Sequence, residues 1–88
     1  MNNLNLKSSK QLGLMVGDII MFFESQPYYD DAGKEHDLSN GVFGIILETR
    51  VYEVKVYWVP DFARVWNPTI SNDYFRKFDR LWYWEKVG

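Results

Sequence analysis

The sequence predicts an all-β fold, a small barrel of five short strands, for three reasons. Several segments alternate polar and apolar residues with the period of two that is typical of a half-buried strand. No segment keeps the helical period of about 3.6 residues for three turns. Of the 88 residues, 47% are hydrophobic and 18% aromatic, which suffices for a single core. Closure into a barrel is favoured because it removes the strand edges through which such aromatic strands aggregate.

The chain is predicted to divide into an N-terminal extended arm, residues 1–13, and the barrel, residues 14–88. The arm is rich in Asn, Ser and Lys but carries Leu4, Leu6 and Leu12. A terminus of this kind either frays or docks on a surface, and we expect it to dock, on the chain itself or on a partner. Such an arm would suit β-augmentation, in which a strand is added to the edge of a neighbouring sheet.

The first strand is predicted within the apolar run of residues 14–23, which Val16-Gly17-Asp18 opens. Residues 24–41 then form a long loop, because turn-forming and acidic residues dominate them. The loop contains His36 among several carboxylates, a combination that could collect a cation. Their spacing departs from that of an EF-hand, so a solvated loop is favoured over a metal site.

Residues 42–50 and 52–59 are predicted as two strands joined by a tight hairpin. In the second of them Tyr52, Val54, Val56 and Trp58 face one way, and Glu53, Lys55 and Tyr57 face the other. This pattern is typical of an antiparallel strand with one buried face.

Residues 63–67 are predicted to return as a short strand, and residues 78–84 to form the last one. Between them, Asp73 could cap one short helical turn that extends through Arg76. We expect Trp66 to lie in the barrel interior beside Trp58 of the neighbouring strand.

Five segments carry a resemblance to a known group of proteins, and they span residues 16–82. They are Val16-Gly17-Asp18, Gly44-Ile45-Ile46, Val54-Lys55-Val56-Tyr57-Trp58, Trp66 and Phe78-Asp79-Arg80-Leu81. Together they resemble SH3-like barrels, and most of all the small KOW- or Tudor-like barrels found among proteins of tailed bacteriophages. The resemblance implies a non-enzymatic protein of the virion, assembled in the host cytoplasm, in a capsid decoration, the neck or the tail.

The first two predicted strands carry apolar residues on both faces, in the runs 19–23 and 42–47. A small barrel buries only its inner face, so one face of these strands needs another cover. Leaving four such side chains in water would forgo several kcal/mol, at about 25 cal/mol per Å². Either the set Ile20, Phe22, Val42 and Ile46 or the opposite set faces outward, and we predict Ile20, Phe22 and Ile46 to lie in a protein interface.

Trp82, Tyr83 and Trp84 are three consecutive aromatic residues, so they cannot all face inward from one strand. Trp and Tyr are enriched in protein interfaces, and we therefore predict that this segment joins the interface. The three leucines of the arm, named above, complete it. Two covers are open. The N-terminal arm could fold back with Leu4, Leu6, Leu12 and Leu14, or another subunit could supply the cover, as another virion protein or a further copy of the chain.

The absence of several motifs argues against catalysis. The sequence has no cysteine, which excludes a disulfide scaffold, a thiolate zinc site and a cysteine nucleophile. It also contains no nucleophile elbow, Gly-rich phosphate loop or HExxH pattern. We expect no catalytic residue, no metal and no cofactor. No apolar run approaches the roughly 18 residues that cross a bilayer, so no membrane partner is expected.

Ten basic and twelve acidic side chains give a formal charge of −2, which disfavours nucleic acid as a partner. The alternative to a virion role is a regulatory SH3- or Tudor-like module that binds nucleic acid or a cationic peptide. In that case aromatic residues would form a cage for a cationic side chain or stack on bases.

Overall fold

The computed structural model describes residues 7–24, 26–59, 61–69 and 83–88 of the chain. The strands within them are β1 (Ile19–Phe23), β2 (Tyr28–Tyr29), β3 (Glu35–His36), β4 (Val42–Thr49), β5 (Val54–Val59), β6 (Phe62–Trp66) and β7 (Tyr83–Lys86). In these ranges, helical conformation is confined to Pro68 and Thr69, and no helix is long and apolar enough to cross a membrane. The prediction of an all-β fold is confirmed.

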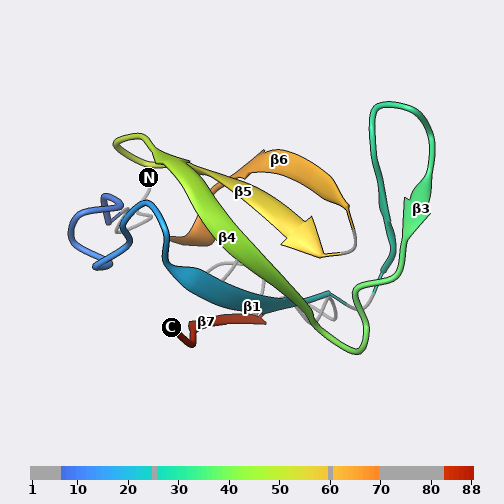
Figure 1. The fold of residues 1–88 in the computed structure, drawn as a ribbon, viewed down its shortest axis with the longest axis horizontal. Helices are drawn as coiled ribbons and strands as arrows, with labels where there is room; N and C mark the ends of the chain where they lie inside the picture. Colours follow the sequence, from blue (N-terminus) through green and yellow to red (C-terminus); the bar gives the residue numbers. More distant parts are fainter. Residues whose placement is uncertain (1–6, 25, 60, 70–82) are drawn as a thin grey trace, which may run out of the picture.

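Five of the strands form one antiparallel sheet in the order β6-β5-β4-β1-β7, and β2 pairs with β3 in a separate hairpin. Strand β1 lies between β4 and β7, so the last strand of the chain returns to pair with the first. Figure 1 shows the hairpin that contains β3 projecting from the sheet, between the end of β1 and the start of β4. This long insertion occupies part of the predicted loop.

In the described part of the chain the sheet is not closed, so the prediction of a closed barrel is not confirmed. Among the described residues, β6 pairs with β5 alone and β7 pairs with β1 alone. Closure requires hydrogen bonds between the two end strands of the sheet, and no such pairing joins β6 to β7 in the described part of the chain. The helical turn predicted from Asp73 to Arg76 lies outside the described residues.

A β-bulge interrupts the pairing of β4 with β5. Ile46 pairs with Val56 on one side of the bulge and Glu48 pairs with Lys55 on the other, so Leu47 is the extra residue. Because side chains alternate with a period of two, one extra residue changes which positions of β4 face the core. A bulge also increases the local twist, and this contributes to the curvature of the sheet.

The core lies on the inner side of the sheet and includes Ile20, Phe22 and Ile46, each completely buried. These three were predicted to face outward, and that prediction is wrong: Ile46 pairs in register with the buried Val56 and so shares its face. Burial of such side chains stabilises the fold by about 1.5–3 kcal/mol each. The remaining core residues are Leu14, Leu38, Val42, Val54, Val56, Trp58, Phe62 and Trp66.

Aromatic rings dominate the centre of this core. The Phe22 ring lies 5.0 Å from that of Trp66 and 5.4 Å from that of Trp58, measured between centroids. In each pair the planes of the two rings are inclined, an arrangement that aromatic rings favour over a face-to-face sandwich. The prediction that Trp58 and Trp66 lie in the interior is confirmed.

Residues 7–14 fold back over the turn between β4 and β5. Ser9 is buried there, its amide donating to the Val51 carbonyl at 2.7 Å and its hydroxyl to the Arg50 carbonyl at 2.6 Å. Leu14 belongs to the core, and Leu12 packs against it. This part of the N-terminal segment is therefore docked on the chain's own sheet.

Candidate docking surface

The outer side of the five-stranded sheet carries an exposed apolar surface. Alternation along each strand places these side chains opposite the core. We call this surface the outer apolar face; it comprises Ile19, Phe43, Ile45, Leu47, Tyr57, Val59, Val65 and Val87. The exposed fractions of these residues run from 37% at Tyr57 to 58% at Val59.

One row of the outer apolar face crosses three strands. Ile19 pairs in register with Ile45, and Ile45 pairs with Tyr57. At the other end of the row, the amide of Val87 donates to the Ile19 carbonyl at 2.9 Å, which places Val87 beside Ile19. Cross-strand neighbours of this kind have Cβ atoms about 4.5–5.5 Å apart, so the row is a continuous apolar ridge.

Ile45 lies at the centre of the face. Its strand, β4, is the middle strand of the sheet, with two strands on each side. Along β4, Phe43 and Leu47 flank Ile45 at equal distance in the sequence, and Phe43 pairs with Val59 in the adjacent row.

The face is large for a monomer of this size. With about 150–250 Å² for each large apolar residue, the eight residues at the exposed fractions given above present roughly 700 Å². The largest apolar patch on a typical monomer measures about 300–600 Å² and is often functional. Sequestering such a surface from water is favourable at about 25 cal/mol per Å².

Charged and polar groups lie at the margin of the face. Glu48 and Lys55 are opposite one another in the register of β4 and β5, and Glu48 Oε2 forms an ion pair with Arg50 Nε at 3.3 Å. The Tyr57 hydroxyl donates to the Asp61 carboxylate, and this bond raises the pKa of Tyr57 above its usual value. The centre of the face is therefore apolar and uncharged, with opposite charges balanced at its margin.

None of the described residues predicted for the interface lies in the outer apolar face. Leu12 is half-buried against the core. Trp84 is also half-buried, with its ring 5.8 Å from Trp66 at 88°, and its Nε1 donates to the Pro68 carbonyl at 2.8 Å. Leu4, Leu6, Trp82 and the side chain of Tyr83 lie outside what the structure describes.

Two opposite sets of outward residues were open for β4, and the set chosen for the interface, which includes Ile46, is the inward one. A regular hairpin that continued the pairing of Glu48 with Lys55 would pair Ile46 with Tyr57, and both would face outward. The bulge at Leu47 moves Ile46 inward instead, and the outward positions pass to the opposite set.

Gly44 is the signal in the sequence that distinguishes the two faces. It is the single residue without a side chain in the run 42–47, and it pairs with Trp58. Where the large ring of a neighbouring strand packs against the core side of a strand, that strand has no space for a side chain and a glycine is needed. Ile46 stands two residues from Gly44 and therefore shares its inward face.

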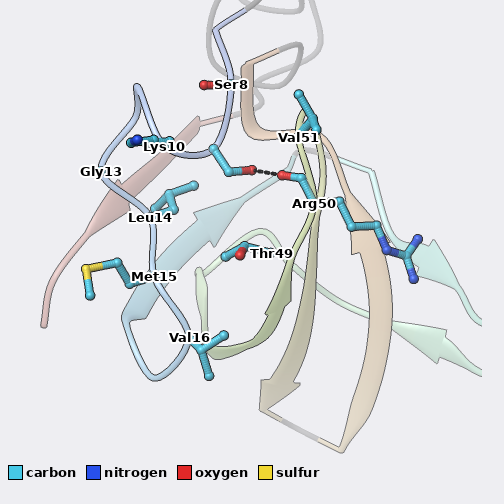
Figure 2. A pocket seen from close by; sticks show the side chains of 10 residues that line it. Ser8, Lys10, Gly13, Leu14, Met15, Val16, Thr49, Arg50 and Val51 are labelled. Carbon is cyan, nitrogen blue, oxygen red and sulfur yellow. Dashed lines mark hydrogen bonds between the residues drawn. The ribbon is translucent and has the colours of Figure 1, made fainter.

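A groove of about 760 Å³ lies between the N-terminal segment and the turn that follows β4. Figure 2 shows Met15 and Val16 on the N-terminal wall and Val51 on the opposite one, with the hydrogen bond from Ser9 to Arg50 spanning the two. All three apolar side chains are exposed. The groove is a second apolar surface, and it exists because residues 7–14 dock where they do.

A smaller hollow of about 300 Å³ lies between the β2–β3 hairpin and the turn that joins β5 to β6. Tyr28 and Phe62 stack in its wall, with centroids 5.2 Å apart and ring planes inclined by 21°. Asp30, Asp31 and Asp61 also line it, and its described lining includes no Lys or Arg. Aromatic faces together with carboxylates suit a cationic group.

The carboxylate of Asp30 is already hydrogen-bonded within the β2–β3 hairpin. Its Oδ2 lies 2.9 Å from Nε2 of the buried His36, and its Oδ1 accepts the amides of Ala32 and Lys34 at 2.9 Å each. These bonds, the one with His36 foremost, hold the pKa of Asp30 below its usual value. Among the described residues, no group of three His, Asp or Glu side chains is placed to hold a metal ion.

The guanidinium of Arg64 packs between Tyr28 of the β2–β3 hairpin and the core on the inner side of the sheet. Its guanidinium carbon lies 4.4 Å from the ring centroid of Tyr28, 5.2 Å from that of Phe22 and 5.9 Å from that of Trp58. Burial lowers the pKa of Arg64, and the charge of Glu24 opposes that shift. In the described part of the chain, Nε and Nη2 of Arg64 are buried without a hydrogen-bond partner.

Comparison with known proteins gives no relative: no family model, curated protein or solved structure matches the chain.

Proposed function

We propose that the chain is a non-enzymatic, SH3-like structural module of a tailed-phage virion, which acts by protein–protein docking through the outer apolar face. It contributes to a capsid decoration, the neck or the tail, and its partners are other virion proteins or further copies of itself. The observation that carries the proposal is the roughly 700 Å² of apolar surface on the outer side of the sheet.

The strand arrangement supports the SH3-like part of the proposal. The main sheet has five strands, a long insertion follows the first of them, and β7 returns to pair with β1. An SH3-like barrel is likewise built from five short strands with a long loop after the first. On this proposal the sheet is an open form of that arrangement, because among the described residues no pairing joins β6 to β7.

The experiment is a test of virion content. Particles purified from infected cells on a density gradient are analysed by quantitative mass spectrometry. We expect the chain in the particle fraction, at a constant number of copies per particle in independent preparations. Its recovery only from the fraction that contains no particles would contradict a virion role.

The acidic hollow favours a second candidate function, a regulatory module that binds a cationic peptide. Asp31 and Asp61 would supply negative charge for a lysine or arginine side chain, whose aliphatic part would pack beside Tyr28 and Ala63. Titration with an arginine-rich peptide at low salt tests this function. Isothermal titration calorimetry is expected to show binding by the wild type that Asp61→Asn weakens, and a wild type that does not bind the peptide excludes the function.

A further inference from the structure

We infer that the outer apolar face is covered by a second copy of this chain, in an isologous dimer whose two-fold axis passes close to Ile45. This inference rests on the proposed function, since it names one partner for the same docking surface. In an isologous dimer the same patch of both subunits meets, so the patch must be complementary to itself.

The area of the face matches what a stable dimer needs. A specific interface of standard size buries about 800 Å² on each partner, and the exposed apolar residues here present roughly 700 Å² before any polar margin is counted. Polar residues at the edge, such as Glu48 and Lys55, add to that area. The face therefore suffices for a dimer without a contribution from a third protein.

The distribution of charge favours a second copy over a charged partner. The centre of the face is uncharged, and at its margin Glu48 stands opposite Lys55. Two identical faces can meet there without bringing like charges together at the centre. A strongly basic or acidic partner, by contrast, would find no concentration of opposite charge on this face to bind it.

The shape of the face also suits a second copy. A sheet packs on another sheet at a separation of about 10 Å, with the strands of the two inclined by about 30° because both sheets twist in the same sense. Two copies of one sheet have the same twist by construction. An axis at Ile45 brings the two Ile45 side chains into contact, and the large flanking residues Phe43 and Leu47 then fill the space on either side.

The experiment uses charge introduced at the centre of the face. Wild-type protein is expected to sediment as a dimer of the 10.5 kDa chain, and Ile45→Lys and Ile45→Glu are each expected as monomers. At Ile45 each variant places two like charges in contact across the axis, so the dimer dissociation constant should rise by roughly 30-fold or more. An equimolar mixture of the two variants should form a dimer again, because the introduced lysine then meets the introduced glutamate.

Two controls accompany this test. Tyr29→Lys changes a residue that is 58% exposed on β2, away from the face, and should leave the dimer intact. Near-ultraviolet circular dichroism of the buried tryptophans shows whether the Ile45 variants remain folded. If one of them unfolds, Val59→Lys with Val59→Glu repeats the experiment at the edge of the same face, where each is expected to weaken the dimer.

Each remaining outcome is decisive. A wild-type protein that is monomeric at about 100 µM, a hundredfold above a micromolar dissociation constant, overturns the inference. Folded variants that are monomeric but do not recombine when mixed overturn the symmetric contact at Ile45. The virion-content test is independent of both results, so a monomer found in purified particles would leave the proposed function intact and refute the second copy alone.

Discussion

Gly44 lies directly opposite Trp58 across the β4–β5 ladder, and a Cβ at Gly44 would stand 2.7 Å from Cε3 of that indole. The same Cβ would be 2.5 Å from Cγ1 of Val56. Both separations are shorter than side-chain carbons tolerate. The glycine is therefore required by the close approach of the core to the backbone of β4.

Gly44→Ala is expected to destabilise the protein by about 1–3 kcal/mol, because the added methyl group overpacks a rigid core. Urea unfolding followed by tryptophan fluorescence measures the change. Val56→Ala removes the nearer of the two obstructing groups, so in that background Gly44→Ala should lower the free energy of unfolding by less. Equal costs in the two backgrounds would show that the core accommodates the methyl group by another route.

Arg64→Lys is expected to destabilise the protein by about 1–2 kcal/mol, because an ammonium group loses the planar stack on Tyr28 and is desolvated in the same place. Thermal and urea unfolding measure the loss. Arg50→Lys is the matched control: its ion pairs with Glu48 and Glu53 are exposed, so a change within about 0.5 kcal/mol is expected. Similar effects at the two positions would refute the role given to the aromatic stack.

Asp30→Asn should alter the pH dependence of stability in a defined direction. The pKa of Asp30 is lowered in the folded state, chiefly by its bond with His36, so the carboxylate stabilises the fold above its ordinary pKa of 3.8. That stabilisation is lost as the pH falls below 3.8 toward the folded-state pKa. Unfolding free energies of wild type and variant, measured from pH 6 to pH 2, should therefore differ most above pH 4 and converge in acid. A difference that does not change with pH would contradict this account.

Ser9→Ala is expected to cost about 1–2 kcal/mol, since the Arg50 and Glu53 carbonyls lose a buried donor. Hydrogen exchange at the amides of Leu12 and Leu14 should accelerate, because Ser9 holds that segment on the turn. Ser39→Ala, which removes an exposed hydroxyl bonded to Asp37, serves as the control. Unchanged exchange in Ser9→Ala would mean that the segment is held by its leucines rather than by this hydrogen bond.

The sequence predicted the element types well where the side-chain alternation was regular. Residues 54–59 alternate cleanly, and their buried and exposed sides are those expected from the pattern. Tyr52, expected on the buried side, instead precedes the strand and is 48% exposed. The strand predicted at residues 63–67 is displaced by one residue, to Phe62–Trp66. Along residues 54–59 the inward residues Val54, Val56 and Trp58 are all apolar and Lys55 marks the opposite face, so the local pattern determines the orientation there.

The β2–β3 hairpin was not predicted, because its stability depends on contacts that are distant in the sequence. Tyr28 stacks on Phe62 of β6, and the buried His36 lies 3.9 Å from the same ring, between centroids. The hairpin has two residues on each strand, too few for a pattern of alternation. Such an element cannot be recognised before the position of β6 is known.

The face of β4 is the part of the candidate site that the sequence left ambiguous. Both sides of the run 42–47 are apolar, so periodicity alone cannot choose between Ile45 and Ile46 as the outward residue. The choice depends on the bulge at Leu47, which the pairing with β5 reveals. Alternation fixes a strand's orientation only as far as the next irregularity of its ladder.

Because of the bulge at Leu47, the effect of deleting one residue from β4 depends on which residue is deleted. Deletion of Leu47 would join Ile46 to Glu48 and restore a regular ladder, with every other partner along β5 kept. Deletion of Gly44 instead would shift the preceding residues by one place, exposing Val42 and turning Phe43 toward the core. Loss of a single codon would thus spare the fold at one site of this strand and reverse half of the strand at the other.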